Sequence, residues 1–183
     1  CFVIPVKDSM EGIFQAVKEA ALIQKRGGGV GYCFSTLRPS GSWVSGCSGI
    51  ASGPLSFMKV FDVMCSTIMQ GNRRGAQMAT FHVSHPDIEY FITAKDDLTQ
   101  LTNFNISVML DDKFMEAVES DGDYELIDPH TRQVVMAVKA KELFDKIAYH
   151  AWKTGEPGVL FIDTANRYNK IKHIGLFKAT NPC

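Results

Sequence analysis

The sequence has no apolar run of the length that crosses a bilayer, about 20 residues, and no basic-then-apolar signal pattern at its N-terminus. It also has no excess of charge, because 19 Lys and Arg residues stand against 20 Asp and Glu residues, a formal net charge of −1. Such a balance gives no global attraction for nucleic acid or an anionic membrane. We therefore expect a cytoplasmic protein that binds neither nucleic acid polymers nor membranes.

Cysteine is scarce and irregularly spaced. The five cysteines are an odd number without a CxxC pair, which fits neither a disulfide framework nor a zinc site. We expect reduced thiols and no metal site. Cys33, Cys47 and Cys65 have neutral or apolar neighbours, which favours small buried or half-buried residues over a redox role. Cys183 follows a predicted strand and an Asn-Pro turn, so we expect it at the carboxyl edge of a parallel sheet, where α/β proteins place their sites.

Strands and helices alternate along the 183 residues, 45% of which are hydrophobic. This order predicts an α/β fold with mainly parallel pairing in one domain, or most of one. The predicted strands are 2–6, 30–34, 78–83, 104–110, 124–127, 134–136, a buried 158–163, and 176–180. The predicted helices are 8–25, 54–70, 86–95, 111–119 and 141–154, the first opened by a capping box from Asp8 to Glu11. A polar loop covers 35–53.

Three short patterns each allow two interpretations. The glycine run 27–31 is either a phosphate cradle or a point where backbones cross closely, and its order after a helix is the reverse of a Rossmann turn. His82 and His85 are metal ligands or structural residues, and no third ligand is near them. Arg73 and Arg74 suit a nucleotide phosphate or base edge, or a solvated loop.

A longer set of motifs, taken in order, resembles the catalytic large chain of ribonucleotide reductase. These motifs are Cys1-Phe-Val-Ile-Pro-Val6 with Asp8-Ser9, the glycine run 27–31, Leu37-Arg-Pro-Ser-Gly41, Ala51-Ser-Gly-Pro-Leu-Ser-Phe-Met58, Gln70-Gly-Asn-Arg-Arg-Gly-Ala76, His85-Pro-Asp87, Asn103-Phe-Asn-Ile-Ser-Val108, Pro157-Gly158, Phe161-Ile-Asp163, Asn166-Arg167 and Ala179-Thr-Asn-Pro-Cys183. Segment 51–58 and the Thr-Asn-Pro-Cys ending most resemble the adenosylcobalamin-dependent class II enzymes.

The resemblance implies a ten-stranded α/β barrel, of which residues 1–183 would be roughly the first half, truncated at both ends. It implies that Cys183 carries a thiyl radical that abstracts the 3′ hydrogen of a ribonucleotide. Asn181 would bind the substrate hydroxyls. Cys1 would supply reducing equivalents by closing a disulfide with a cysteine beyond residue 183. Gly28 and Gly29 would bring the backbone close to the substrate.

The resemblance also implies regulation and partners. Asp8, Arg38, Arg73 and Arg74 match positions that contact a dNTP or ATP effector or relay its identity. The broad apolar helix 54–70, which periodicity alone allows as a core helix or a subunit contact, would pair two subunits as a homodimer. A thioredoxin-like reductant would serve the full-length enzyme.

Two alternatives to the class II enzyme remain open in the sequence. A class I enzyme, whose radical comes from a separate metal subunit, uses nearly the same barrel and binds no cobalamin. A non-catalytic nucleotide-binding module would keep the effector helix and loops without the chemistry. Because the family's catalytic Glu, expected two residues after Cys183, and its shuttle cysteines are absent, we expect the isolated 183 residues to be inactive. Cysteines at both ends suggest either a coding piece between self-splicing inserts or a partial sequence.

Overall fold

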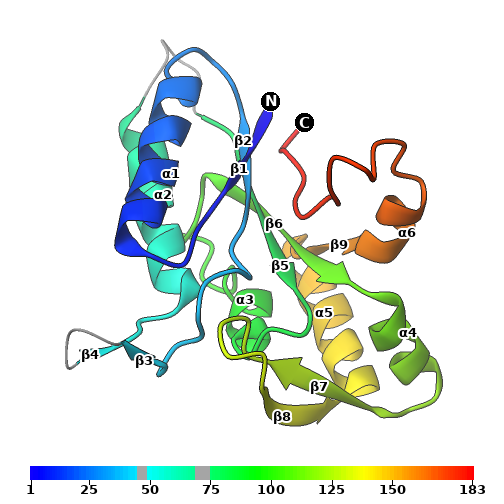
Figure 1. Ribbon diagram of the computed structural model, residues 1–183. Coiled ribbons are helices and arrows are strands. Elements are labelled where there is room, and N and C mark those ends of the chain that lie inside the picture. Colours follow the sequence, from blue (N-terminus) through cyan, green and yellow to red (C-terminus); the bar gives the residue numbers. More distant parts are fainter. Residues whose placement is uncertain (45–48, 69–74) are drawn as a thin grey trace.

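The computed structural model of the chain describes residues 1–44, 49–68 and 75–183. Its centre is a parallel sheet of five strands in the order β1-β2-β5-β6-β9 (Figure 1). These strands are β1 (Phe2–Pro5), β2 (Val30–Cys33), β5 (Gln77–His82), β6 (Phe104–Leu110) and β9 (Gly158–Phe161). Two antiparallel hairpins stand apart from the sheet, β3 (Trp43–Val44) with β4 (Gly49–Ile50) and β7 (Asp123–Ile127) with β8 (Val134–Lys139). The predicted α/β class with parallel pairing is confirmed.

Helices connect the strands and cover the sheet. They are α1 (Met10–Gln24), α2 (Pro54–Thr67), α3 (Ile88–Ile92), α4 (Asp112–Glu119), α5 (Ala140–Thr154) and α6 (Ile162–Arg167). Figure 1 shows α1 and α2 side by side, in contact with each other, whereas α4, α5 and α6 lie toward the other end of the sheet. Within the described residues, no helix has the length and apolar character needed to cross a membrane.

Aromatic side chains fasten α2 to the middle of the sheet. The Phe61 ring of α2 lies 4.8 Å from the Tyr32 ring and 5.3 Å from the Phe34 ring, centroid to centroid. The Tyr32 hydroxyl donates to Gln77 Oε1 at 3.0 Å, and Gln77 Nε2 donates to the Phe61 carbonyl at 3.0 Å. These buried polar groups are thus satisfied inside an apolar core, which fixes α2 against β2 and β5.

The N-cap of the first helix is one residue later than the Asp8 that opens the predicted capping box. Ser9 is the N-cap, and its Oγ accepts the Gly12 N–H at 3.0 Å. The Asp8 carboxylate instead accepts from Arg38, after β2, so the proposed Asp8 cap is wrong. A local pattern identified the helix but not the long-range ion pair that takes the carboxylate away from it.

The C-terminal third also departs from prediction. β9 ends at Phe161 and is largely exposed rather than buried, because it lies at the edge of the sheet, where β6 is its one partner among the described strands. Residues 168–183 form turns and irregular backbone, so the strand predicted at 176–180 is wrong. This segment returns to the sheet and ends beside the N-terminus (Figure 1).

Candidate active site

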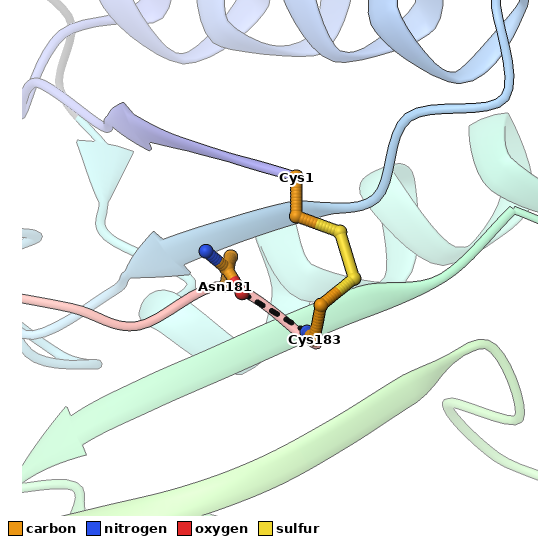
Figure 2. Close-up of a disulfide and its surroundings, with 3 residues drawn as sticks. All are labelled: Cys1, Asn181 and Cys183. Carbon is orange, nitrogen blue, oxygen red and sulfur yellow. Dashed lines mark hydrogen bonds between the residues drawn. A yellow bond between two sulfur atoms is a disulfide. The ribbon is translucent and has the colours of Figure 1, made fainter.

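The two terminal cysteines meet. Cys1 and Cys183 form a disulfide with their Cα atoms 6.4 Å apart (Figure 2). The expectation that all thiols are reduced is therefore wrong for this pair. The pairing of Cys1 with a cysteine beyond residue 183 stays a prediction, because that cysteine is not among these 183 residues. The two cysteines are 182 positions apart in the chain, and they come into contact because the C-terminal segment returns to the sheet beside β1.

Two glycines of the run 27–31 make this meeting possible. A Cβ built on Gly31 would lie 1.9 Å from the Thr180 carbonyl oxygen, and one on Gly29 would lie 2.7 Å from Pro182 Cγ and 3.1 Å from Cys1 Sγ. Only a residue without a side chain allows these approaches. Of the two interpretations of the glycine run, the close crossing of backbones is therefore correct for Gly29 and Gly31. Gly28 faces Ile23 of α1 and Phe2 instead.

The position of Cys183 corrects the prediction that it lies at the carboxyl edge of the sheet. Lys178 lies near Cys33 at the end of β2, Thr180 lies against Gly31, and Pro182 lies against Gly29 at its start. The segment therefore runs antiparallel to β2 across the face of the sheet. It carries Cys183 to the amino edge, where β1 and β2 begin.

Asn181 is held beside Cys183. Its Oδ1 accepts the backbone N–H of Cys183 at 3.0 Å, and Figure 2 shows its amide nitrogen on the side away from the disulfide. This local bond, together with Pro182 between the two residues, restricts the turn that presents Cys183.

Two other cysteines have raised pKa values. Burial is the main cause for Cys33, and burial together with the Asp62 carboxylate raises the pKa of Cys65 to about 11. Both are free thiols, half-buried and buried respectively, as the sequence predicted. Thiols with raised pKa values are poor nucleophiles at neutral pH. Cys47 lies outside the described residues.

The predicted effector residues Asp8 and Arg38 meet at the carboxyl edge of β1 and β2. Arg38 Nε donates to Asp8 Oδ2 at 2.9 Å, and the two side chains are each 20% exposed. His130, from the turn between β7 and β8, places its Nδ1 3.5 Å from Asp8 Oδ2. No sequence signal pointed to His130, because its approach depends on where the β7–β8 hairpin folds. Arg73 and Arg74 lie outside the described residues.

The two histidines singled out in the sequence have structural hydrogen bonds. His85 Nδ1 accepts the Asp87 N–H at 3.0 Å, which leaves Nε2 to donate to the Leu37 carbonyl at 2.9 Å. His82 Nδ1 accepts the Ser84 N–H at 3.2 Å. Burial lowers the pKa of both rings, so both are neutral at pH 7. Among the described residues, no cluster of three or more His, Cys, Asp or Glu side chains is arranged to hold a metal ion.

Comparison with known proteins identifies the family. The family model for the ribonucleotide reductase barrel domain matches residues 1–183. A vitamin B12-dependent ribonucleoside-diphosphate reductase of Thermoplasma acidophilum is 48% identical over the whole chain, and one of Mycobacterium tuberculosis is 46% identical. A vitamin B12-dependent ribonucleotide reductase of Streptomyces coelicolor is 38% identical. The chain spans 24%, 26% and 21% of these three proteins, about a quarter of their lengths.

Proposed function

The chain belongs to the ribonucleotide reductase family as part of its barrel domain, and from this premise we propose that it forms part of an enzyme that reduces ribonucleotides to 2′-deoxyribonucleotides. The recognition from sequence motifs is confirmed, and so is the assignment of the fold to a partial α/β barrel. The observation that carries the proposal is the shared position of Cys1 and Cys183 beside Gly29, with Asn181 fixed next to them.

The proposed chemistry divides between the two cysteines. The Cys183 sulfur, as a thiyl radical, takes the 3′ hydrogen of the ribose and returns it at the end of the reaction. The 2′ hydroxyl leaves as water, and two thiols, one of them Cys1, supply two electrons and close a disulfide. The outward amide nitrogen of Asn181 binds a substrate hydroxyl. Since the Cys1–Cys183 disulfide removes the thiol that must become the radical, this pair has to be reduced before turnover.

Adenosylcobalamin is the radical source that we propose, because the relatives described above carry vitamin B12-dependent names. When bound, it supplies the radical that Cys183 needs. The pocket beside Phe177 and Lys178, on the segment that carries Cys183, has a volume of about 480 Å³. That pocket lies at the edge of the sheet opposite Cys183, so among the described residues we name none as a holder of the cofactor.

Regulation and assembly are further parts of the proposal. Asp8 and Arg38 form an ion pair at which a nucleotide effector would bind, and Arg73 and Arg74, which lie outside the described residues, are proposed from the resemblance alone as further effector residues. A homodimer would form through helix 54–70, and a thioredoxin-like protein would reduce the cysteine pair.

The test uses the longer enzyme that contains this chain, reduced with dithiothreitol and assayed with cytidine diphosphate or triphosphate. We expect deoxycytidine nucleotide only when adenosylcobalamin is added. Turnover without the cofactor would overturn the class II assignment, and no product under any condition would favour a non-catalytic nucleotide-binding module. The 183-residue chain alone serves as the inactive control.

A further inference from the structure

A pocket at the carboxyl edge of the sheet lies apart from the cysteine pair. Its volume is about 480 Å³, and it is lined from the ends of β2, β5 and β6, the start of α6 and the β7–β8 turn. The Cys1–Cys183 pair lies at the opposite edge, where the strands begin. Of the proposed catalytic, substrate and effector residues that the structure describes, none lines this pocket.

The lining combines an apolar floor with cations. Met109, Ile127, Ile162 and Phe177 supply apolar surface, and Phe177 is 45% exposed, so part of its side chain is open to contact. Arg132 and Lys178 also line the pocket, and both are exposed. A pocket of this size with mostly apolar walls and a few polar groups is typical of small-molecule sites.

The other ionisable groups of the lining leave the pocket with a positive balance. Asp163 is the carboxylate of the lining, and its Oδ2 already accepts the Asp112 N–H at 2.9 Å. His82 and His85 are neutral, because burial lowers the pKa of each ring. Among the described lining residues, the two cations therefore outnumber the single carboxylate. An anionic group gains more from this lining than a cationic one.

The turn that presents Arg132 is fixed from several sides. Asp128 Oδ1 accepts the N–H groups of His130 and Thr131 at 2.7 and 3.1 Å, and the Arg132 N–H donates to the Asp128 carbonyl at 2.9 Å. The Ile127 N–H donates to the Ser84 carbonyl at 2.7 Å, which ties the hairpin to the end of β5. Arg132 itself has a φ of 62°, a conformation that favours glycine.

We propose that this pocket binds a small aromatic phosphate ester of mononucleotide size, with the ring on the apolar floor beside Phe177 and the phosphate on Arg132 and Lys178. An aromatic ring and a charge-assisted phosphate contact are the interactions that such a lining offers. The proposal does not depend on ribonucleotide reduction, since it rests on the pocket alone.

Methyl NMR on the 183-residue chain, titrated with phenyl phosphate and with adenosine monophosphate, tests the proposal. We expect the Met109 methyl resonance to shift on titration and that of Met58, fully buried in the core, to stay in place. Adenosine without a phosphate should bind at least roughly tenfold more weakly.

Two variants and two controls decide the outcome. Lys178→Gln and Arg132→Gln should each weaken binding roughly fivefold to tenfold, whereas Lys172→Gln, an exposed lysine of the same segment that does not line the pocket, should leave it unchanged. Circular dichroism checks that each variant folds. The proposal is overturned if Met109 does not respond to millimolar phosphate ester. It is equally overturned if only Arg38→Gln abolishes binding, because the ligand would then occupy the Asp8–Arg38 site.

Discussion

Gly31 is the residue on which the position of Cys183 depends most directly. A Cβ there would lie 1.9 Å from the Thr180 carbonyl oxygen, a contact between backbone groups that no side-chain rotation can relieve. We predict that Gly31→Ala pushes segment 180–183 off the sheet and lowers the fraction of chains with a Cys1–Cys183 disulfide. It should also reduce the free energy of unfolding by about 1–3 kcal/mol, as overpacking does.

Thiol alkylation with mass spectrometry measures the disulfide, and urea unfolding measures the stability. Gly175→Ala is the matched control, because nothing lies within 4 Å of a Cβ at that position, in the same C-terminal segment. A Gly31→Ala chain with undiminished pairing would contradict the close crossing.

His85 gives the fold a pH dependence of known sign. Burial outweighs the nearby Asp87 and Asp128 carboxylates and lowers the pKa of the ring below its ordinary value of about 6.5. The unfolded chain therefore takes up the proton first as the pH falls. The stability from the neutral ring is present above about pH 6.5 and is lost as the pH falls toward the lowered pKa.

Urea unfolding at pH 7.5 and pH 5.5 should show this loss of stability, and His85→Gln should make it smaller. His173→Gln is the control, since His173 is exposed. His82, whose pKa burial also lowers, leaves a residual dependence in the His85 variant. Equal pH dependence in the wild type and His85→Gln would show that His85 does not contribute.

At the scale of elements, the start of α1 has two candidate capping side chains, Asp8 and Ser9, and the sequence alone does not show which of them caps the helix. Ser9→Ala should reduce the free energy of unfolding by about 1 kcal/mol and speed amide exchange at Gly12, because the Ser9 hydroxyl accepts that N–H. Asp8→Ala should leave exchange at Gly12 unchanged, because its carboxylate pairs with Arg38. Faster amide exchange at Gly12 in Asp8→Ala would contradict this account and would show that Asp8 caps the helix.

Elements defined by local pattern were predictable, and those defined by distant contacts were not. The prediction for β6 as 104–110 was correct to the residue, since its alternation and flanking turns are local. β9 was predicted too long and buried, because a sequence does not say which strand lies at an edge. The prediction of a strand at 176–180 is wrong because the backbone of Thr180 packs on the face of the sheet over Gly31 and does not pair with an edge strand.

The candidate site also has parts that the sequence predicted and parts that it did not. Cys1, Asn181, Cys183 and Gly29 were named from motifs and do lie together. The edge of the sheet that they occupy was predicted wrongly, because nothing local shows that the C-terminal segment crosses the sheet before it ends. His130 and Arg132 were missed because a hairpin far along the chain presents them.

At the scale of the whole molecule, α1 and α2 each carry exposed apolar side chains, and we propose that these helices contact a second subunit. Phe14 and Leu22 of α1 are 48% and 54% exposed, and Val63 of α2 is 63% exposed. We predict that the longer enzyme is a dimer through these helices, and that Phe14→Asp with Val63→Asp shifts it to monomers, because charge is costly in an apolar interface.

Sedimentation equilibrium measures the association state. Leu98→Asp is the control, since Leu98 is 71% exposed and lies outside both helices. A dimer that survives the paired substitution would place the subunit contact elsewhere.

The central claim is that Cys183 carries the radical in ribonucleotide reduction, and the most direct measurement is deoxyribonucleotide formation by the longer enzyme with and without that sulfur. With reductant, adenosylcobalamin and a ribonucleotide present, we predict product from the wild type and from Cys33→Ala, and none from Cys183→Ala. Product formed by Cys183→Ala at a rate close to that of the wild type would contradict the account.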